Sequence, residues 1–402
     1  MKTREVKLGE VANVKGGKRI PKGIGLMNIP NGHPYIRVRD LNNKRLLELD
    51  NSYEYVDNET QKVISKYTVK TGDVVLSIVG TIGLVAIVGR TLDGANLTEN
   101  CVKLSSFHGV NRDFLYYYLR SDCGQQEIRC GTVGAVQAKL PIKNIQNIAI
   151  NLPDYTTQER IASLLLSIDR KIELNQKIND NLEQQAVALF KSWFVDFSLF
   201  GGTVPENWED TTLENITTLI TRGIAPKYSD NSDQTVVNQK CIRNHTIDLS
   251  LARTHTPKAI NEKWLKFGDL LINSTGDGTL GRVAQVWFAP KALTVDSHVT
   301  IVRPAREELI FYIGLWGILH EKEIESLHTG STGQTELPRD RLKMLKLLLP
   351  DNISLSRFNS IITPMASTII SNQEENQKLA SLRDTLLPKL MSGEIDVSNI
   401  QF

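Results

Sequence analysis

The feature that most constrains the fold is an internal repeat that runs through almost all of the 402 residues. TIGLVAIV at 81–88 resembles TLGRVAQV at 279–286, and the Gly-Asp pair at 72–73 recurs at 268–269. Three further matches share an offset of 197 residues, namely Phe114 with Phe311, Leu140 with Leu337, and Pro153 with Pro350. A repeat of this length predicts two copies of one structural unit.

Each copy ends in a glycine-free stretch with a heptad seam, in which residues alternate at spacings of four and three. The first seam is Ile161, Leu165, Ile168, Ile172, Asn175, Asn179, Leu182, Ala186, Leu189 and Trp193. The positions 197 residues later are Phe358, Ile362, Met365, Ile369, Asn372, Asn376, Leu379, Arg383, Leu386 and Leu390. Each stretch predicts a helix of about 37 residues, about 55 Å long. We expect the two helices to pack antiparallel.

The four seam asparagines lie at equivalent positions in the two helices, where buried amides would fix the register at some cost in stability. Two positions break the equivalence of the helices. Arg383 stands where the first helix has Ala186, and Pro364 is expected to kink the second helix or delay its onset.

A globular segment precedes each helix. It contains short β-branched runs such as YIRVRDL and DVVLSIVG between Gly and Asn turns, mixed with short helical stretches. The predicted fold is α+β, with two α/β domains around twisted sheets, each followed by a long helix. The helices are expected to form an antiparallel coiled coil with pseudo-two-fold symmetry. The expected segments are a first domain at 1–154, a first helix at 155–197, a second domain at 198–351, a second helix at 352–392 and a tail at 393–402.

The cysteine pattern and hydropathy predict a cytoplasmic protein without a membrane span. The four cysteines form no C-x-x-C pair, so neither a zinc site nor a disulfide framework is indicated. The most apolar segment, 74–89, is interrupted by Ser, Thr and Gly, whereas a membrane helix needs about 20 apolar residues.

Catalytic motifs are missing from the sequence. The Gly-Lys pair at 17–18 is followed by Arg19 and lacks the first glycine of a phosphate loop. No G-x-G-x-x-G fingerprint occurs, and there is no Asn-Pro-Pro or Asp-Pro-Pro motif of the kind that amino-methyltransferases use. His320-Glu321 is followed by Ile324 where a zinc-protease helix needs its second His. We therefore predict no catalytic residue, no metal ligand and no cofactor bound by this chain.

The chain resembles the specificity subunits of type I restriction-modification systems. The resemblance rests on the repeat, on QERIASLLLSIDRKIELNQKINDNLEQQAVALFKSWF from Gln158, and on LLPKLMSGEI at 386–395. It implies a non-catalytic subunit whose two target-recognition domains each read half of a split sequence in double-stranded DNA. It also implies two modification subunits that use S-adenosylmethionine for adenine methylation. Restriction subunits that translocate and cleave DNA with ATP and Mg would join through the complex.

Local charge indicates where DNA contacts could lie. The net charge is only +2, but residues 1–45 hold eleven Lys and Arg against three acids. Base reading needs polar or cationic side chains in loops that reach the DNA. The candidate DNA contacts are Lys15, Lys18, Arg19, Lys22, Arg37, Arg39, Gln137, Lys139, Arg222, Lys227, Lys240, Arg243, Asn244, Thr332 and Gln334.

The candidate loops differ between the halves: GGKRIPKG faces RGIAPKYS, and TVGAVQAKL faces STGQTEL. Unlike loops predict two different half-sites. The sequence leaves two other functions open. One is a coiled-coil adaptor that binds proteins without DNA, and the other is a recognition module for a single-chain methylating nuclease.

Overall fold

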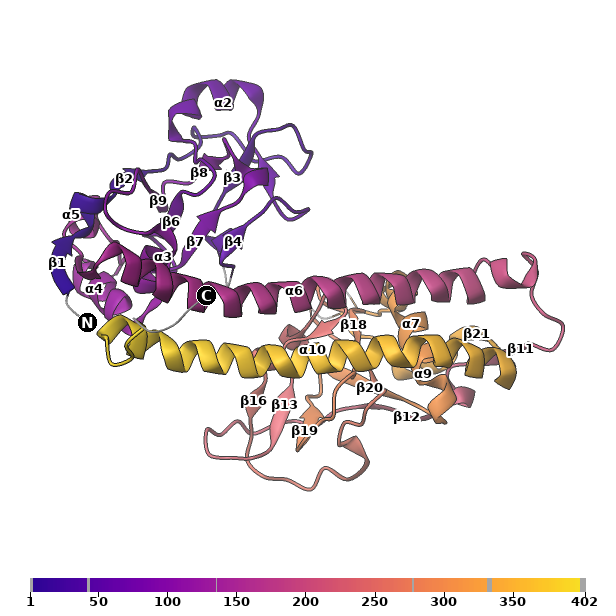
Figure 1. Cartoon of the computed structure of the whole chain (residues 1–402). Helices are drawn as coiled ribbons and strands as arrows, with labels where there is room; N and C mark the ends of the chain where they lie inside the picture. Colours follow the sequence, from indigo (N-terminus) through magenta and orange to yellow (C-terminus); the bar gives the residue numbers. More distant parts are fainter. Residues whose placement is uncertain (1–2, 42–43, 135, 277, 331–334, 398–402) are drawn as a thin grey trace. The chain divides into compact units, whose positions relative to one another are not determined.

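The computed structural model describes residues 3–41, 44–134, 136–276, 278–330 and 335–397, and it divides into two compact units. Unit 1 is Met1–Glu173 with Gln377–Phe402, and unit 2 is Leu174–Asn376. Two long helices, α6 (Tyr155–Phe194) and α10 (Asn352–Ser392), each contribute one part to either unit (Figure 1). The predicted segment boundaries instead assigned each helix to a segment of its own.

Unit 1 contains a five-stranded sheet and a smaller, three-stranded sheet. The strand order of the large sheet is β2 (Asn13–Gly16), β9 (Cys101–Ser105), β6 (Val74–Ser77), β7 (Val85–Val88) and β4 (Leu46–Leu47). Neighbours are antiparallel except β4 with β7. The small sheet has the order β5 (Glu54–Tyr55), β3 (Pro34–Ile36) and β8 (Asn96–Leu97).

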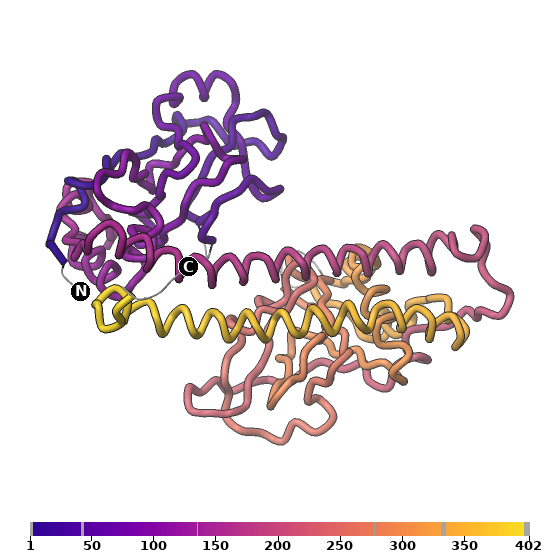
Figure 2. Tube along the Cα trace, viewed as in Figure 1, coloured from indigo at the N-terminus to yellow at the C-terminus, as the bar shows by residue number. Residues whose placement is uncertain are grey.

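The first and last strands of the domain in unit 1 pair with each other. β1 (Thr3–Lys7) runs antiparallel to β10 (Ala149–Pro153), which ends immediately before α6. Figure 2 shows the trace of α6 as one long coil. The remaining helices of unit 1 are α1 (Leu8–Val11), α2 (Asn58–Ile64), α3 (Arg112–Arg120), α4 (Asp122–Gly131) and α5 (Ile142–Gln146). The start of the chain is thereby fixed to the base of the long helix.

Unit 2 repeats this plan. Its main antiparallel sheet has the order β12 (Thr217–Arg222), β20 (Val299–Pro304), β17 (Leu270–Asn273) and β18 (Val283–Gln285), with β11 (Glu209–Thr212) paired to β21 (Lys346–Leu349) before α10. The second sheet is β16 (Arg253–Thr254), β13 (Thr235–Val237) and β19 (Leu293–Val295). The helices are α7 (Ile310–Leu319), α8 (Glu321–Ser326) and α9 (Arg339–Lys343). Where unit 1 has β4, unit 2 has a hairpin of β14 (Ile242–Arg243) and β15 (Thr246–Ile247).

The repeated Gly-Asp motif makes the same turn in both units. Each glycine has a φ of +87°, a conformation that a residue with a side chain rarely adopts. Each aspartate is buried and accepts a backbone N–H three residues earlier in the chain. Asp73 also pairs with Lys103 at 3.3 Å, and Asp269 pairs with Arg303 at 2.7 Å. The motif therefore fixes the turn before β6 and β17 to the neighbouring strand.

The repeated Pro-Asp motif starts the two long helices. Asp154 accepts the backbone N–H of Thr157 at 3.0 Å, and Asp351 accepts that of Ser354 at 3.0 Å, as helix-capping side chains do. Burial opposes the ionisation of Asp351, but hydrogen bonds from Ser354 and Trp208 lower its pKa to about 2. Local sequence thus sets where each helix begins.

The predicted antiparallel coiled coil is confirmed by contacts inside each unit. In unit 2, Asn175 Nδ2 donates to Asn376 Oδ1 at 2.9 Å and Asn372 Nδ2 donates to Asn179 Oδ1 at 2.8 Å. In unit 1, Ile161 and Leu165 of α6 share a hydrophobic core with Leu390 of α10. Along these contacts the residue numbers rise on α6 as they fall on α10, so the two helices run antiparallel. All the predicted seam residues of both helices are buried or partly buried.

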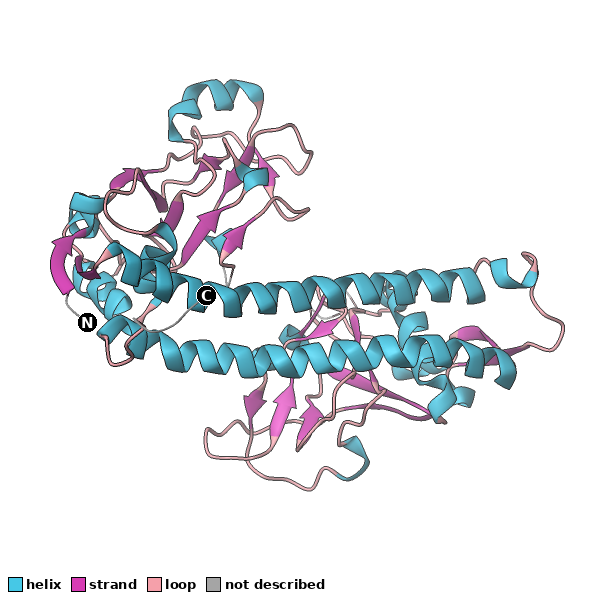
Figure 3. Cartoon of the chain, viewed as in Figure 1, coloured by secondary structure: helices cyan, strands magenta, loops and turns pink. Residues whose placement is uncertain are grey.

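The expected delay of the second helix at Pro364 is wrong. Figure 3 shows α10 as a long helix, and it begins at Asn352, well before the proline. Asp351 caps the helix start, and Leu355, Phe358 and Ile362 are fully buried in the core of unit 2. The cap and this burial hold the first turns in place, and Pro364 lies on the exposed face.

Candidate nucleic-acid interface

A close-packed glycine positions the basic loop that follows β2 in unit 1. The Gly17 N–H donates to Cys101 O at 3.0 Å, and the Lys18 N–H donates to Leu97 O at 2.8 Å. A Cβ at position 17 would lie 2.1 Å from the Thr98 carbonyl oxygen, so only glycine allows this approach. Backbone hydrogen bonds and the close contact at Gly17 therefore fix the loop, and the Lys18 side chain is exposed to solvent.

Lysines from three separate segments gather around one tyrosine in unit 1. Lys15, Lys66 and Lys103 line a cavity of about 240 Å³ together with Tyr67. The Lys18 ammonium lies 5.6 Å from the centre of the Tyr67 ring. Lys103 forms an ion pair with Asp73. By contrast, three lysines are exposed and form no ion pair within the described residues, namely Lys15, Lys18 and Lys66. These three lysines, with Tyr67, are called the lysine cluster below.

The predicted arginines of unit 1 are held by acidic partners. Arg19 bonds Glu99 at 2.5 Å but stays largely exposed. Arg37 and Arg39 both pair with Glu54, the second at 3.0 Å. Burial, followed by the charge of Arg39, lowers the pKa of Arg37. The arginines are thus fixed in place, and their charge is balanced inside the unit.

The other predicted contacts of unit 1 lie on exposed loops. Lys22, Gln137 and Lys139 are exposed. The backbone of Lys139 exchanges two hydrogen bonds with that of Val133, at 2.8 and 2.9 Å. This closes the segment between them into a loop that presents Gln137 to solvent.

In unit 2, Gly223 plays the part that Gly17 plays in unit 1 and fixes the loop that follows β12. A Cβ at Gly223 would lie 1.9 Å from the Val295 carbonyl oxygen. Arg222, just before it, pairs with Glu336 at 2.7 Å and donates to Leu337 O at 3.1 Å. Arg222 therefore connects β12 to the segment before α9.

The remaining described candidates of unit 2 are exposed on two segments. Lys240, Arg243 and Asn244 are exposed on the 3-10 turn before β14 and on the β14–β15 hairpin, where Asn244 has a φ of +50°. Lys227 is exposed on the segment that follows β12. Thr332 and Gln334 lie outside the described residues.

Sequence reasoning missed several polar residues that the fold brings to these loops. In unit 1 they are Lys66 and Tyr67, and an adjacent lysine and tyrosine was a usable signal, since aromatic and cationic side chains both bind nucleic acids. In unit 2, Thr275 Oγ1 lies 2.7 Å from His298 Nδ1 and donates to Gln239 Oε1 at 3.3 Å. Nothing in the sequence pattern links these three residues.

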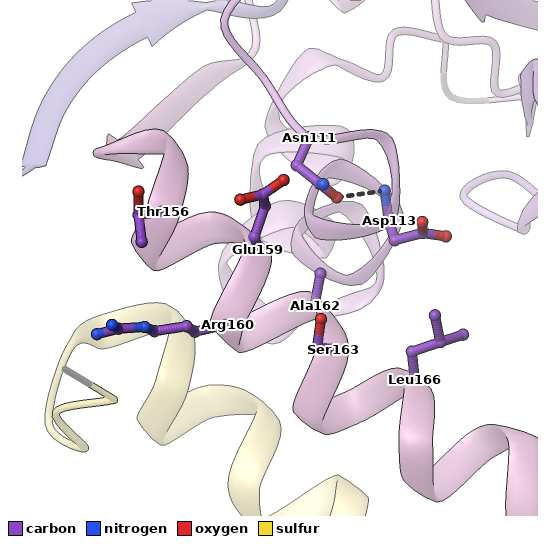
Figure 4. Close-up of a pocket in the computed structure, with 8 residues that line it drawn as sticks. All are labelled: Asn111, Asp113, Thr156, Glu159, Arg160, Ala162, Ser163 and Leu166. Atoms are coloured by element: carbon purple, nitrogen blue, oxygen red, sulfur yellow. Dashed lines mark hydrogen bonds between the residues drawn. The ribbon is translucent and has the colours of Figure 1, made fainter. Parts of the chain in front are cut away.

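A second cavity in unit 1, of about 400 Å³, lies between the start of α3 and the first turns of α6. Figure 4 shows its lining, which includes Asn111, Asp113, Glu159 and Arg160. The Asn111 side chain accepts the Asp113 N–H at 2.9 Å and caps α3. Two carboxylates make this cavity a poor site for phosphate. It is separate from the lysine cluster.

Metal-binding clusters and membrane-spanning helices are both absent from the part of the chain that the structure describes. No group of three or more His, Cys, Asp or Glu side chains there could hold a metal ion. No described helix has the length and apolar character needed to cross a membrane.

The structure shows two units of one plan, each with exposed basic residues on its loops, and comparisons with known proteins point to one family. Residues 2–184 match the family described as the type I restriction modification DNA specificity domain. The MjaIX specificity subunit of Methanocaldococcus jannaschii is 25% identical over 393 residues, covering 91% of this chain and 88% of that protein. The HindI specificity subunit of Haemophilus influenzae is 22% identical, covering 67% and 73%.

A solved structure shares the fold. The S subunit of a type I restriction-modification system from M. genitalium superposes with a TM-score of 0.54 at 15% identity, covering 97% of this chain and 96% of that one. The chain is thus similar in sequence to specificity subunits of type I restriction-modification systems, and it shares the fold of one.

Proposed function

We propose that this chain is a specificity subunit without catalytic residues of its own, and that it recognises a bipartite, asymmetric DNA sequence, one half-site with each unit. The lysine cluster of unit 1 carries the proposal. Three exposed lysines without acidic partners among the described residues stand around an exposed tyrosine, next to a loop fixed by its backbone. Such cations can neutralise DNA phosphates, and the rigid loop gives them a defined position.

Different residues at equivalent positions support two unlike half-sites. Ile78 N–H donates to Asn100 O in unit 1, and Ser274 N–H donates to His298 O in unit 2 at the same point of the sheet. Unit 2 therefore offers an imidazole, bonded to Thr275, where unit 1 offers an amide. Different hydrogen-bonding groups favour different bases.

The same proposal assigns chemistry to partner subunits. Two modification subunits would use S-adenosylmethionine to methylate adenine, and restriction subunits would use ATP and Mg to translocate and cleave DNA. The names of the archaeal and Haemophilus relatives, which describe specificity subunits of type I restriction enzymes, support this division of labour. The complex would act in the cytoplasm, and the candidate DNA contacts of both units would meet the duplex.

An adenine-methylation map of the host genome tests the recognition role. The map is recorded with the intact gene and with an in-frame deletion. We expect the deletion to remove one split motif with two different half-sites. A motif that is a perfect inverted repeat would contradict the asymmetry, and an unchanged map would contradict the role itself.

The salt dependence of DNA binding tests the lysine cluster. The full chain, assembled with its modification subunits, is titrated with duplex that carries the mapped motif. Each phosphate contact contributes about 0.9 to the slope of log K against log salt. We therefore expect Lys15→Gln, Lys18→Gln and Lys66→Gln together to reduce that slope by up to about 2.7.

Lys62→Gln is the matched control, because this exposed lysine lies in the same unit but pairs with Glu59 at 2.7 Å. Its slope should equal that of the wild type. An unchanged slope for the triple variant would remove the cluster from the interface. A wild-type chain without DNA affinity at any salt would support the protein-binding adaptor instead.

A further inference from the structure

One buried ion pair joins the two long helices in unit 1. The Arg383 Nη1 of α10 lies 2.9 Å from Asp169 Oδ1 of α6. The other carboxylate oxygen of Asp169 accepts the Tyr117 hydroxyl at 2.6 Å. The side chains of Asp169 and Arg383 are only 6% and 19% exposed. Both oxygens of the carboxylate are therefore satisfied, one of them from the opposite helix.

The repeat has no charged counterpart to this pair. At the offset of 197 residues, Asp169 corresponds to Ala366, Arg383 to Ala186, and Tyr117 to Gly314. Both alanines are buried in the core of unit 2, at 2% and 0% exposure. The same place on the helical seam is thus ionic in unit 1 and apolar in unit 2.

The amide contacts of the seam treat the two helices alike. Asn175 contacts Asn376, and Asn179 contacts Asn372, so the repeat, which relates 175 to 372 and 179 to 376, maps one contact onto the other. Two copies of α6, or two copies of α10, could form the same amide pairs. The other seam positions, apart from Arg383, are apolar in both helices and would also match. Two features differ between a like and an unlike pair of helices. One is the hydrogen bond from Asn175 to Glu375 at 2.7 Å, whose counterpart position is Ile178, and the other is the buried ion pair of positions 169 and 383.

We infer that Asp169 and Arg383 are a pairing determinant, through which the first half of a chain accepts only a second-half helix, its own or that of another copy. In a pair of two α6 helices, Asp169 faces Ala186 and lacks its cation, and the loss occurs twice. In a pair of two α10 helices, Arg383 faces Ala366 and keeps only the exposed Asp384 of its own helix, which it contacts at 2.8 Å, so the cross-helix partner is again lost twice. An unpaired buried charge is strongly unfavourable, so each lost ion pair lowers the population of like pairs by about 100-fold or more.

The test separates the halves after the whole chain has folded. A protease site is placed at residues 201–205, which follow α6 and are mostly exposed. Two differently tagged copies are cut, mixed, loosened in moderate urea and diluted, and native mass spectrometry counts the pairs. Wild-type pieces should rejoin only as first half with second half. The Asp169→Ala/Arg383→Ala variant should also give the two like pairings, because the buried charges that oppose them are gone.

Two further variants complete the design. Asp169→Arg/Arg383→Asp restores an ion pair with exchanged charges, so its pieces should again form only unlike pairs. Glu374→Ala/Lys378→Ala is the control, because it removes one acid and one base from exposed positions of α10. It should behave as the wild type.

Three results would overturn the inference. They are like pairs in wild-type samples at statistical frequency, exclusively unlike pairs in the double-alanine variant, and halves that do not rejoin at all. The last counts because the inference requires helix pairing to hold the halves together. The measurement uses no DNA, so these results leave the proposed recognition of DNA untouched.

Discussion

Glu183, on the part of α6 in unit 2, should make that unit less stable as the pH rises. Burial first, and then the charge of Asp180, raise the pKa of Glu183 from 4.5 to about 7, although His245 opposes the rise. A carboxyl with a raised pKa holds its proton longer in the folded state than in the unfolded state. The folded state therefore binds more protons between pH 4.5 and 7, and stability falls across that window.

The size of the effect follows from the pKa. Each pKa unit corresponds to about 1.4 kcal/mol, so a rise from 4.5 to about 7 gives at most on the order of 3 kcal/mol. Glu183 is only partly buried, and water screens part of this energy. Glu183→Gln, which imitates the protonated carboxyl, should therefore stabilise unit 2 by about 1–3 kcal/mol at pH 8 and have little effect at pH 4.5.

Urea denaturation at the two pH values measures this directly. The five tryptophans, at positions 193, 208, 264, 287 and 316, all lie in unit 2, so their fluorescence reports the unfolding of that unit. Glu374→Gln, at an exposed position in the same unit, is the control and should show no pH-dependent gain. An equal gain for Glu183→Gln at both pH values, or none at pH 8, would refute the reasoning.

Three other changes have defined outcomes. Asn179→Leu removes the acceptor of the partly buried Asn372 amide and should cost unit 2 about 1–2 kcal/mol by the same fluorescence assay, whereas changing both asparagines to Leu should recover most of the loss; an equal loss in both would contradict the pairing. Asp351→Ala removes the cap of α10 and should cost about 1–2 kcal/mol at pH 7. Since the pKa of Asp351 is lowered from 3.8 to about 2, that loss should shrink as the pH falls through this window, and a pH-independent loss would count against the cap. Gly17→Ala places a methyl group against Thr98 O and should weaken DNA binding through the displaced Lys18 loop, with unchanged affinity as the contrary result.

The architecture could be predicted because its signals are local or periodic. The repeat predicted two copies of one fold, and the 3.5-residue spacing predicted two long helices, since only one face of each helix can be buried. The Pro-Asp motifs recur because each carboxylate caps a helix within three residues of itself. The seam asparagines were expected to fix the register, and the fold then shows which amides meet, Asn175 with Asn376 and Asn179 with Asn372.

The partners of individual charges could not be predicted in this way. Arg37 and Arg39 were candidates for DNA contact, but the fold brings Glu54 to both of them from another strand. Lys66 was not a candidate, yet it joins Lys15 around Tyr67. The sequence shows only that an arginine carries a charge. Whether this charge pairs with an acid of the same unit depends on the distance between the two side chains, and that distance follows from how the strands pack.

The sequence by itself determined the repeat, the two helices and their antiparallel register, because these follow from which residues must leave water together. The tertiary structure decided what the exception at Arg383 means. In the sequence it only breaks the heptad pattern, but in the fold it meets Asp169 and Tyr117 inside unit 1. The physical reason is that apolar burial depends on pattern, whereas a buried charge depends on one particular partner, and that partner lies 214 residues away in the chain.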